Sequence, residues 1–84
     1  MSQAANNIEE KFWRIFKRVL NIDDSSGTVT KDGTEEWDSL RHVELIFELE
    51  TSFDLDVSPD EIVELYSDTD VILNFLHQRT GEQN

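Results

Sequence analysis

Apolar side chains recur every three or four residues near the start of the chain, as they do along one face of a helix. This spacing predicts a first helix from about Asn7 to Leu20. Its apolar positions are Ile8, Phe12, Ile15, Phe16 and Val19, widened by Trp13 and Leu20. Asn6, with Glu9 three residues later, has the spacing of a capping pair. We expect the apolar stripe to belong to the core.

From Asn21 to Glu36 the helical spacing stops and turn-forming residues replace it. This segment contains Asp23-Asp24-Ser25-Ser26-Gly27 and Lys31-Asp32-Gly33, whose residue types favour turns. A loop of this length is uncommon in a small domain, so we expect Val29 to pin it to the core. The run Thr28-Val29-Thr30 is too short to predict a strand.

A second helix is predicted from about Ser39 to Ser52, and its apolar residues fall in two arcs. Each residue turns about 100° around a helix, which places one arc toward the core. That arc contains Leu45, Ile46, Leu49 and Phe53. A narrower arc contains Leu40, Val43 and Phe47, with Glu50 between the two arcs. Either the loop or the next helix covers the narrower arc, or it is a docking ridge. We favour a ridge flanked by Glu44, Glu48 and Glu50 that fits a groove rimmed with Arg or Lys.

Two further helices follow. Ser58-Pro59-Asp60-Glu61 combines a capping serine, a proline at the first helical position and a glutamate at the third. Apolar positions of this short third helix are Ile62, Val63, Leu65 and Tyr66. Ser67 with Asp70 is suited to cap a fourth helix, which Gly81 ends. Its apolar face is Val71, Ile72, Phe75 and Leu76. We therefore predict one all-α domain over residues 1–84, with a helical core at about 7–79 and flexible ends.

The negative charge of the chain is unevenly distributed. Residues 1–24 carry four basic and four acidic side chains, whereas residues 25–84 carry three basic and fifteen acidic ones. The whole net charge of −12 thus lies in the second part. Such a field repels nucleic acid and anionic membranes and steers proteins with basic patches toward it. Charge alone leaves two interpretations open, plain solubility and partner steering.

Several classes of site and location are disfavoured by the sequence. There is no cysteine for a disulfide or a thiolate metal site. No apolar run reaches membrane-spanning length, and the N-terminus lacks a signal pattern, so we expect the cytoplasm. The segment Asp54-x-Asp56-x-Ser58 begins like a calcium loop but has Pro59 and Leu65 where glycine and glutamate are required. His42 and His77 are not spaced as a metal pair, so we expect no metal.

One run carries most of the functional information: Trp37-Asp38-Ser39-Leu40-Arg41-His42-Val43-Glu44-Leu45-Ile46-Phe47-Glu48-Leu49-Glu50-Thr51-Ser52-Phe53. It resembles the signature of acyl and peptidyl carrier proteins. That resemblance implies a four-helix bundle of acyl-carrier type, with three main helices, a short third helix and a long first loop. It also implies 4′-phosphopantetheine on Ser39, with Asp38 helping to present the serine. The thiol of that group would hold an acyl or aminoacyl cargo as a thioester, and the chain itself would not be an enzyme.

The resemblance also implies partners. A phosphopantetheinyl transferase would modify Ser39, an acyl- or aminoacyl-loading ligase or transferase would charge the thiol, and downstream biosynthetic enzymes would use it. The partner-facing residues would be Leu40, Val43, Glu44, Phe47 and Glu48 on a monomer. Trp37, Arg41 and His42 depart from many fatty-acid carriers and favour a specialised pathway. The aromatic side chains predict weak sequestration of long acyl chains.

Two other functions can be weighed against a carrier. The chain could be a small acidic inhibitor or adaptor whose Ser39 only caps a helix, since Ser and Asp are both good caps. A hydrolase using Ser39 and His42 is disfavoured, because no Gly-x-Ser-x-Gly turn or oxyanion donor is present. Counting about 100° per residue places His42 toward the core-facing arc of the second helix, which predicts a packed or hydrogen-bonded histidine.

Overall fold

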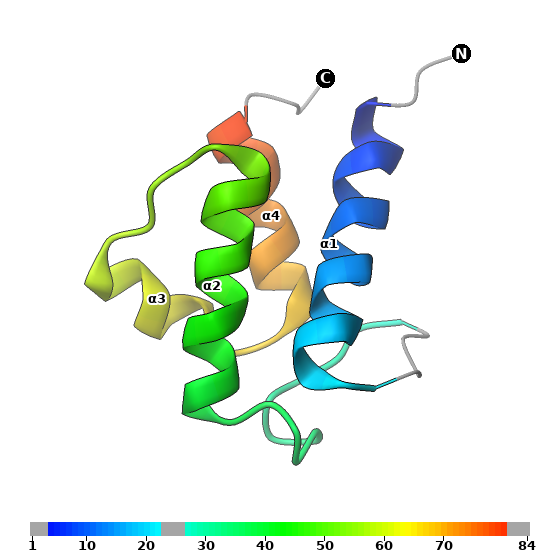
Figure 1. Ribbon diagram of the computed structural model, residues 1–84, viewed down its shortest axis with the longest axis vertical. Coiled ribbons are helices and arrows are strands. Elements are labelled where there is room, and N and C mark those ends of the chain that lie inside the picture. Colours follow the sequence, from blue (N-terminus) through cyan, green and yellow to red (C-terminus); the bar gives the residue numbers. More distant parts are fainter. Residues whose placement is uncertain (1–3, 23–26, 81–84) are drawn as a thin grey trace.

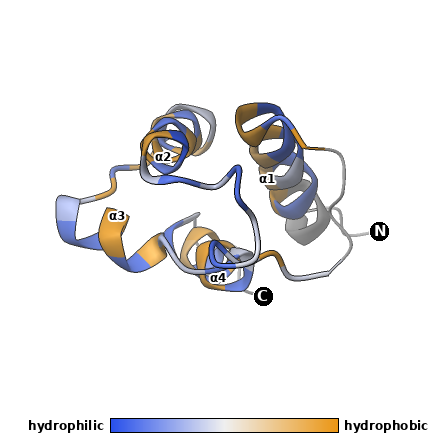
Figure 2. Cartoon of the chain, turned by 90° about the horizontal axis from the view of Figure 1, so that it is seen from below, coloured by the Kyte–Doolittle hydropathy of each residue, from blue (hydrophilic) through white to orange (hydrophobic). Residues whose placement is uncertain are grey.

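The computed structural model describes the backbone of residues 4–22 and 27–80, and the side chains of 8–22 and 27–80. These residues form four helices and no strand, namely α1 (Ala4–Leu20), α2 (Ser39–Phe53), α3 (Pro59–Leu65) and α4 (Thr69–Thr80). The three longer helices lie alongside one another, and α3 lies on the side of α2 away from α1 (Figure 1). Seen along the helices, α1 and α2 form one row and α3 and α4 the other (Figure 2). The prediction of an all-α chain is confirmed, and the arrangement is compatible with a small helical bundle.

The core lies between the helices and uses the predicted apolar stripes. The longer helices bury Ile8, Phe12, Ile15, Phe16 and Leu20 from α1, Leu45, Ile46 and Leu49 from α2, and Ile72 and Leu76 from α4. Trp37, Val57 and Leu65 complete the buried cluster from the loops and α3. Burial of this apolar area is the main favourable term that holds so small a domain together.

The ends of α1 and α2 differ slightly from prediction. α1 begins at Ala4, so Asn6 lies inside the helix and the predicted cap is wrong. Alanine has the highest helix propensity, which is why the two alanines before Asn6 extend the helix. Both helices end in a left-handed residue, Asn21 with φ 58° and Asp54 with φ 55°. In each case the next amide bonds back five residues, as from Leu55 N–H to Glu50 O at 3.1 Å.

Serine and aspartate cap the last two helices. The Ser58 hydroxyl accepts the Glu61 N–H at 3.3 Å, and a Glu61 carboxylate oxygen accepts the Ser58 N–H at 2.9 Å. The predicted capping box of α3 is therefore confirmed. At α4 the prediction of Ser67 is wrong, because Asp68 directly precedes the helix and its Oδ1 accepts the Val71 N–H at 2.9 Å. The predicted stop at Gly81 lies outside the described residues.

The long loop after α1 is fastened to the turn between α3 and α4. Val29 N–H donates to Thr69 Oγ1 at 3.0 Å, and Val29 O accepts the Thr69 N–H at 2.9 Å. Lys31 N–H donates to Ser67 O at 2.9 Å, giving an isolated bridge between Thr30 and Asp68. Val29 also packs against the core, as predicted. None of the helices in the described part of the chain has the length and hydropathy that spanning a bilayer requires.

Candidate functional site

Ser39 is the first residue of α2, and its side chain is exposed. The residue that caps α2 is Asp38, which has extended backbone and whose Oδ1 accepts the Arg41 N–H at 2.8 Å. Within the described part of the chain the Ser39 hydroxyl has no hydrogen-bond partner. The expectation that Ser39 shares or supplies the cap is therefore wrong, because Asp38 alone satisfies this amide. The Ser39 oxygen is left available for chemistry.

Replacing Asp38 by alanine should loosen the turn that carries Ser39. The variant loses the cap bond to the Arg41 amide, so we expect the free energy of unfolding to fall by about 1 kcal/mol. Urea unfolding followed by circular dichroism measures the change. Glu35→Ala is the matched control, since Glu35 is an exposed acid of the same loop without a hydrogen bond among the described residues. Equal losses in the two variants would contradict the assigned cap.

Trp37 anchors the chain two residues before the serine. Its side chain is only 2% exposed, and its ring meets Phe16 edge-on with centroids 5.1 Å apart. Its carbonyl accepts the Tyr66 hydroxyl at 3.1 Å. The approach to Ser39 is thus held by α1 on one side and by the end of α3 on the other.

His42 lies beneath this turn and is 3% exposed. Trp37 Nε1–H donates to His42 Nδ1 at 3.1 Å, so Nε2 carries the proton and donates to Ile62 O at 2.7 Å. Burial lowers the pKa of His42 below 6.5, and the bond to Ile62 O partly opposes this. The predicted packed, hydrogen-bonded histidine is confirmed. Because both ring nitrogens are engaged, neither can take a proton from Ser39.

Arg41 joins the start of α2 to the end of α1. Its Nη1 donates to Leu20 O at 3.1 Å and lies 3.5 Å from Val19 O. These carbonyls are the negative end of α1, where a cation is favourable. This contact was not predicted from the sequence. One signal was present, since a cation in the first turn of a helix is unfavourable unless it is used elsewhere.

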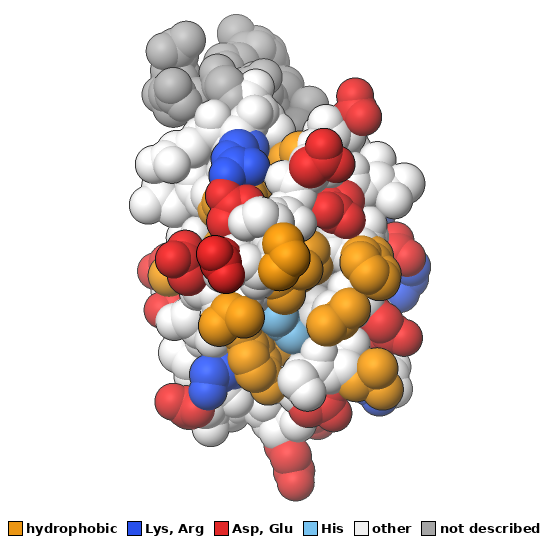
Figure 3. All heavy atoms as spheres, turned by 90° about the vertical axis from the view of Figure 1, so that its left-hand side faces the viewer, with side chains coloured by type: hydrophobic (Ala, Val, Ile, Leu, Met, Phe, Trp, Pro, Cys, Tyr) orange, Lys and Arg blue, Asp and Glu red, His pale blue; other side chains and the backbone are white. Residues whose placement is uncertain are grey.

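An exposed apolar surface adjoins Ser39 on the face formed by α2 and α3 (Figure 3). We define the apolar surface as Leu40, Val43 and Phe47 of α2, which are 70%, 37% and 58% exposed, with Val63 of α3, which is 73% exposed. Neither the loop nor α3 covers the narrower arc of α2, so that alternative is wrong. Val63, predicted on the apolar side of α3, and Val71, predicted on the apolar face of α4, are both exposed. Because α3 has only seven residues, it can bury one narrow side against the core and leaves Val63 on the opposite, exposed side.

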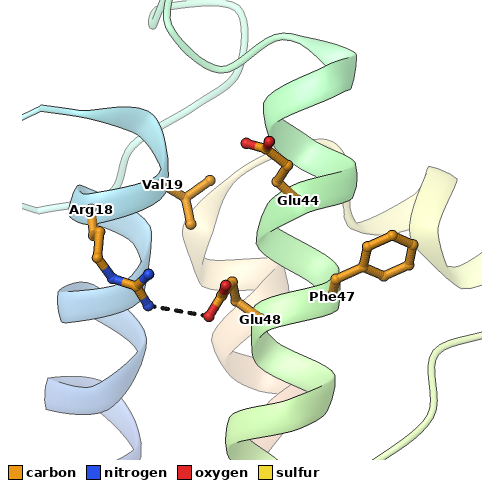
Figure 4. A pocket seen from close by; sticks show the side chains of 5 residues that line it. All are labelled: Arg18, Val19, Glu44, Phe47 and Glu48. Carbon is orange, nitrogen blue, oxygen red and sulfur yellow. Dashed lines mark hydrogen bonds and ion pairs between the residues drawn. The ribbon is translucent and has the colours of Figure 1, made fainter.

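The three acids predicted to flank this surface have different roles. Glu44 is exposed and has no ion pair within the described part of the chain. Glu48 pairs with Arg18 of α1 at 3.2 Å, and Phe47 points away from α1 (Figure 4). Glu50 is not a flanking charge, because its Oε2 accepts the Val57 N–H at 2.8 Å and fixes the turn after α2. An open depression of about 360 Å³ between α1 and α2 is lined by Arg18, Val19, Glu44, Phe47 and Glu48.

No protein-family model matches this chain, and searches of curated proteins and of solved structures find no significant match. Among the described residues no group of three or more histidine and acidic side chains is placed to hold a metal ion. The site therefore has to be interpreted from its own geometry, which combines a free hydroxyl at a helix start with an exposed apolar surface.

Proposed function

We propose that this chain is an acyl or aminoacyl carrier protein of the acyl-carrier type, with 4′-phosphopantetheine attached to Ser39. The observation that carries the proposal is the exposed Ser39 hydroxyl, which takes no part in capping α2. It stands within the run Trp37 to Phe53 that resembles the carrier signature. The all-helical arrangement with a long first loop and a short α3 supports the same proposal.

The residues around Ser39 fit such an attachment. Asp38, Ser39 and Leu40 are all exposed, so a transferase can reach the hydroxyl. In the transfer, Ser39 Oγ bonds to the phosphorus of the pantetheine phosphate and the nucleotide part of coenzyme A leaves. The hydroxyl proton passes to a base of the transferase. The attached group supplies a thiol on which an acyl or aminoacyl cargo is held.

The remaining side chains position the serine and recognise partners. Asp38 holds the first turn of α2, and Trp37 and Arg41 fasten that turn to the neighbouring helices. The apolar surface with Glu44 and Glu48 offers apolar knobs beside negative charge, which suits a partner groove rimmed with basic residues. We expect partners to approach from this face.

The proposed cargo is an acyl or aminoacyl group. Trp37, Arg41 and His42 set this run apart from many fatty-acid carriers, and each is engaged within the fold. Because the run departs from those carriers at these three positions, we include a specialised pathway in the proposal. The loading and downstream enzymes remain those that use an acyl or aminoacyl thioester.

The direct test is the intact mass of the chain after co-expression with a broad phosphopantetheinyl transferase. We expect a gain of one phosphopantetheine group per chain. An unchanged mass, with a known carrier modified in parallel, would overturn the proposal. The chain would then be better explained as a small acidic adaptor or inhibitor that uses the same apolar surface, with Ser39 unmodified.

Two valines of equal exposure test where the transferase docks. Val43 on α2 is 37% exposed and Val71 on α4 is 38% exposed, and only Val43 belongs to the apolar surface. We expect Val43→Ser to lower kcat/KM for modification about fivefold, corresponding to about 1 kcal/mol of lost contact. Val71→Ser should leave kcat/KM near the wild-type value. Similar effects of both substitutions would place docking elsewhere.

A further inference from the structure

A closed set of hydrogen bonds links the loop before Ser39, helix α2 and helix α3. Trp37 of the loop donates to His42 of α2, and His42 donates to the carbonyl of Ile62 in α3. Tyr66, at the end of α3, donates back to the carbonyl of Trp37. Its ring also stacks on the imidazole, with centroids 4.7 Å apart and planes inclined by 27°. His42 contacts each of the three others.

Other contacts also hold α3, since the side chains of Ile62 and Tyr66 pack, partly buried, against the core. Leu65 is buried in the core near the C-terminal end, and Glu61 near the N-terminal end forms an ion pair with Arg79 of α4. The 2.7 Å bond from His42 reaches the middle of the helix, at the residue directly before Val63. Since Val63 is the α3 member of the apolar surface, the His42 bond and the packing of Ile62 on the core together position it relative to the α2 members.

This arrangement accommodates only a neutral His42. The Trp37 indole donates to Nδ1, so a second proton on that nitrogen would place two donors face to face. Tyr66 is the titratable group that faces the ring from the end of α3, and Lys31 Nζ lies 5.0 Å from the centre of the Tyr66 ring. From the loop, the Asp38 carboxylate is engaged with the Arg41 amide.

The neighbours from the other elements give no compensating negative charge. On α2 itself, the guanidinium of Arg41 turns to the carbonyls of α1, and α1 contributes the uncharged Phe16 beside Trp37. Glu61 of α3 is paired with Arg79 of α4. Within the described part of the chain no carboxylate contacts the imidazole. An imidazolium here would be desolvated without a counter-charge, which is costly.

We propose that His42 is the positioning residue that holds α3, and with it Val63, against α2, and that a proton on His42 releases this hold. A protonated ring is better solvated outside its site. When it leaves, both Trp37 and Ile62 lose their bonds to it. Val63 then no longer has a fixed position beside the α2 residues of the apolar surface, and the segment before Ser39 becomes looser. The core contacts of Leu65 remain.

An NMR titration from neutral pH downward tests this. The probes are the Trp37 indole N–H, the Val63 methyl groups and the α3 amides. We expect the three to change together at one midpoint below 6.5, the ordinary pKa of histidine, since burial disfavours the imidazolium. Amide exchange in α3 should accelerate at that midpoint, before exchange in α1 and α4 does. A shift of the indole signal with Val63 unmoved would overturn the proposal.

Two histidine variants separate His42 from the rest of the chain. His42→Gln keeps one acceptor and one donor but takes no proton in this range, so we expect its transition to disappear. His77→Gln removes the other histidine of the sequence and should keep the transition. Loss of the transition in His77→Gln would contradict the assignment, as would its persistence in a folded His42→Gln. None of these measurements needs a transferase, so their failure would leave the carrier proposal standing.

The same site affects stability. In the unfolded chain His42 has its ordinary pKa of 6.5, and in the folded chain its pKa is lower. As the pH falls below about 6.5, the unfolded chain therefore binds the proton first. The free energy of unfolding should fall from there down to the folded-state pKa, and the His42 contribution should be constant above that window. His42→Gln should remove this part of the pH dependence.

Discussion

Ser39→Ala is expected to abolish the gain of a phosphopantetheine group while leaving the fold intact. The hydroxyl is exposed and has no hydrogen-bond partner among the described residues, so its removal breaks no contact. The free energy of unfolding should therefore stay within about 0.5 kcal/mol of the wild type. Intact mass after co-expression with the transferase, followed by urea unfolding of the same sample, measures both properties.

Ser58→Ala is the matched control, because Ser58 is the serine that does cap a helix. It should lose about 1 kcal/mol of stability and still gain the full mass. We therefore expect opposite results for the two serine variants, since Ser39→Ala loses the mass gain and keeps its stability, whereas Ser58→Ala keeps the mass gain and loses stability. Modification that persists in Ser39→Ala would place the attachment on another residue. A marked loss of stability in Ser39→Ala would show that this hydroxyl is structural.

Trp37→Ala is expected to cause the largest loss of stability of the substitutions considered. The ring is almost fully buried, packs on Phe16 and donates to His42, so the substitution leaves a cavity and an unpaired acceptor. Removing such a side chain typically costs about 3–5 kcal/mol. The total stability of an 84-residue domain is about 4–13 kcal/mol. Urea unfolding should show a much lower midpoint.

Two further tryptophan variants separate the contribution of buried volume from that of the hydrogen bond to His42. Trp13→Ala removes the other tryptophan, which is only half-buried, and should cost clearly less. Trp37→Phe keeps much of the volume but removes the donor to His42 Nδ1, so it should cost about 1–3 kcal/mol. If Trp37→Ala were no more destabilising than Trp13→Ala, the anchoring role of Trp37 would be wrong.

Much of the helical fold was predictable because it depends on local patterns. Apolar spacing located all four helices, and Ser58 with Glu61 marked the start of α3. The errors fell at helix ends. Ser67 and Asp68 are adjacent residues that both cap well, and the choice between them was made by contacts with the distant loop at Lys31. Such long-range competition leaves no mark in the local sequence.

The candidate site was predictable to the extent that helix geometry decides it. The angle count separated Leu40, Val43 and Phe47 from the core-facing residues, and the structure confirms their exposure. The angle count did not find Val63, since the placement of α3 beside α2 depends on tertiary contacts such as the His42 bond and the packing of Ile62 and Leu65. Nor could it assign Glu50 to the turn after α2, because the preference of that carboxylate for the Val57 amide follows from tertiary placement.

The hydrogen bond from Arg41 to Leu20 O has a practical consequence for engineering. The first turn of α2, which carries Ser39, is tied to α1 directly, and the bridge at Thr30 separately holds the later part of the connection between α1 and α2. Residues inserted between Ile22 and Val29 would therefore lengthen a connection whose two ends are already fixed. The added cost in loop-closure entropy is small. A reporter peptide or fluorescent label grafted there should leave Ser39 and the first turn of α2 in place.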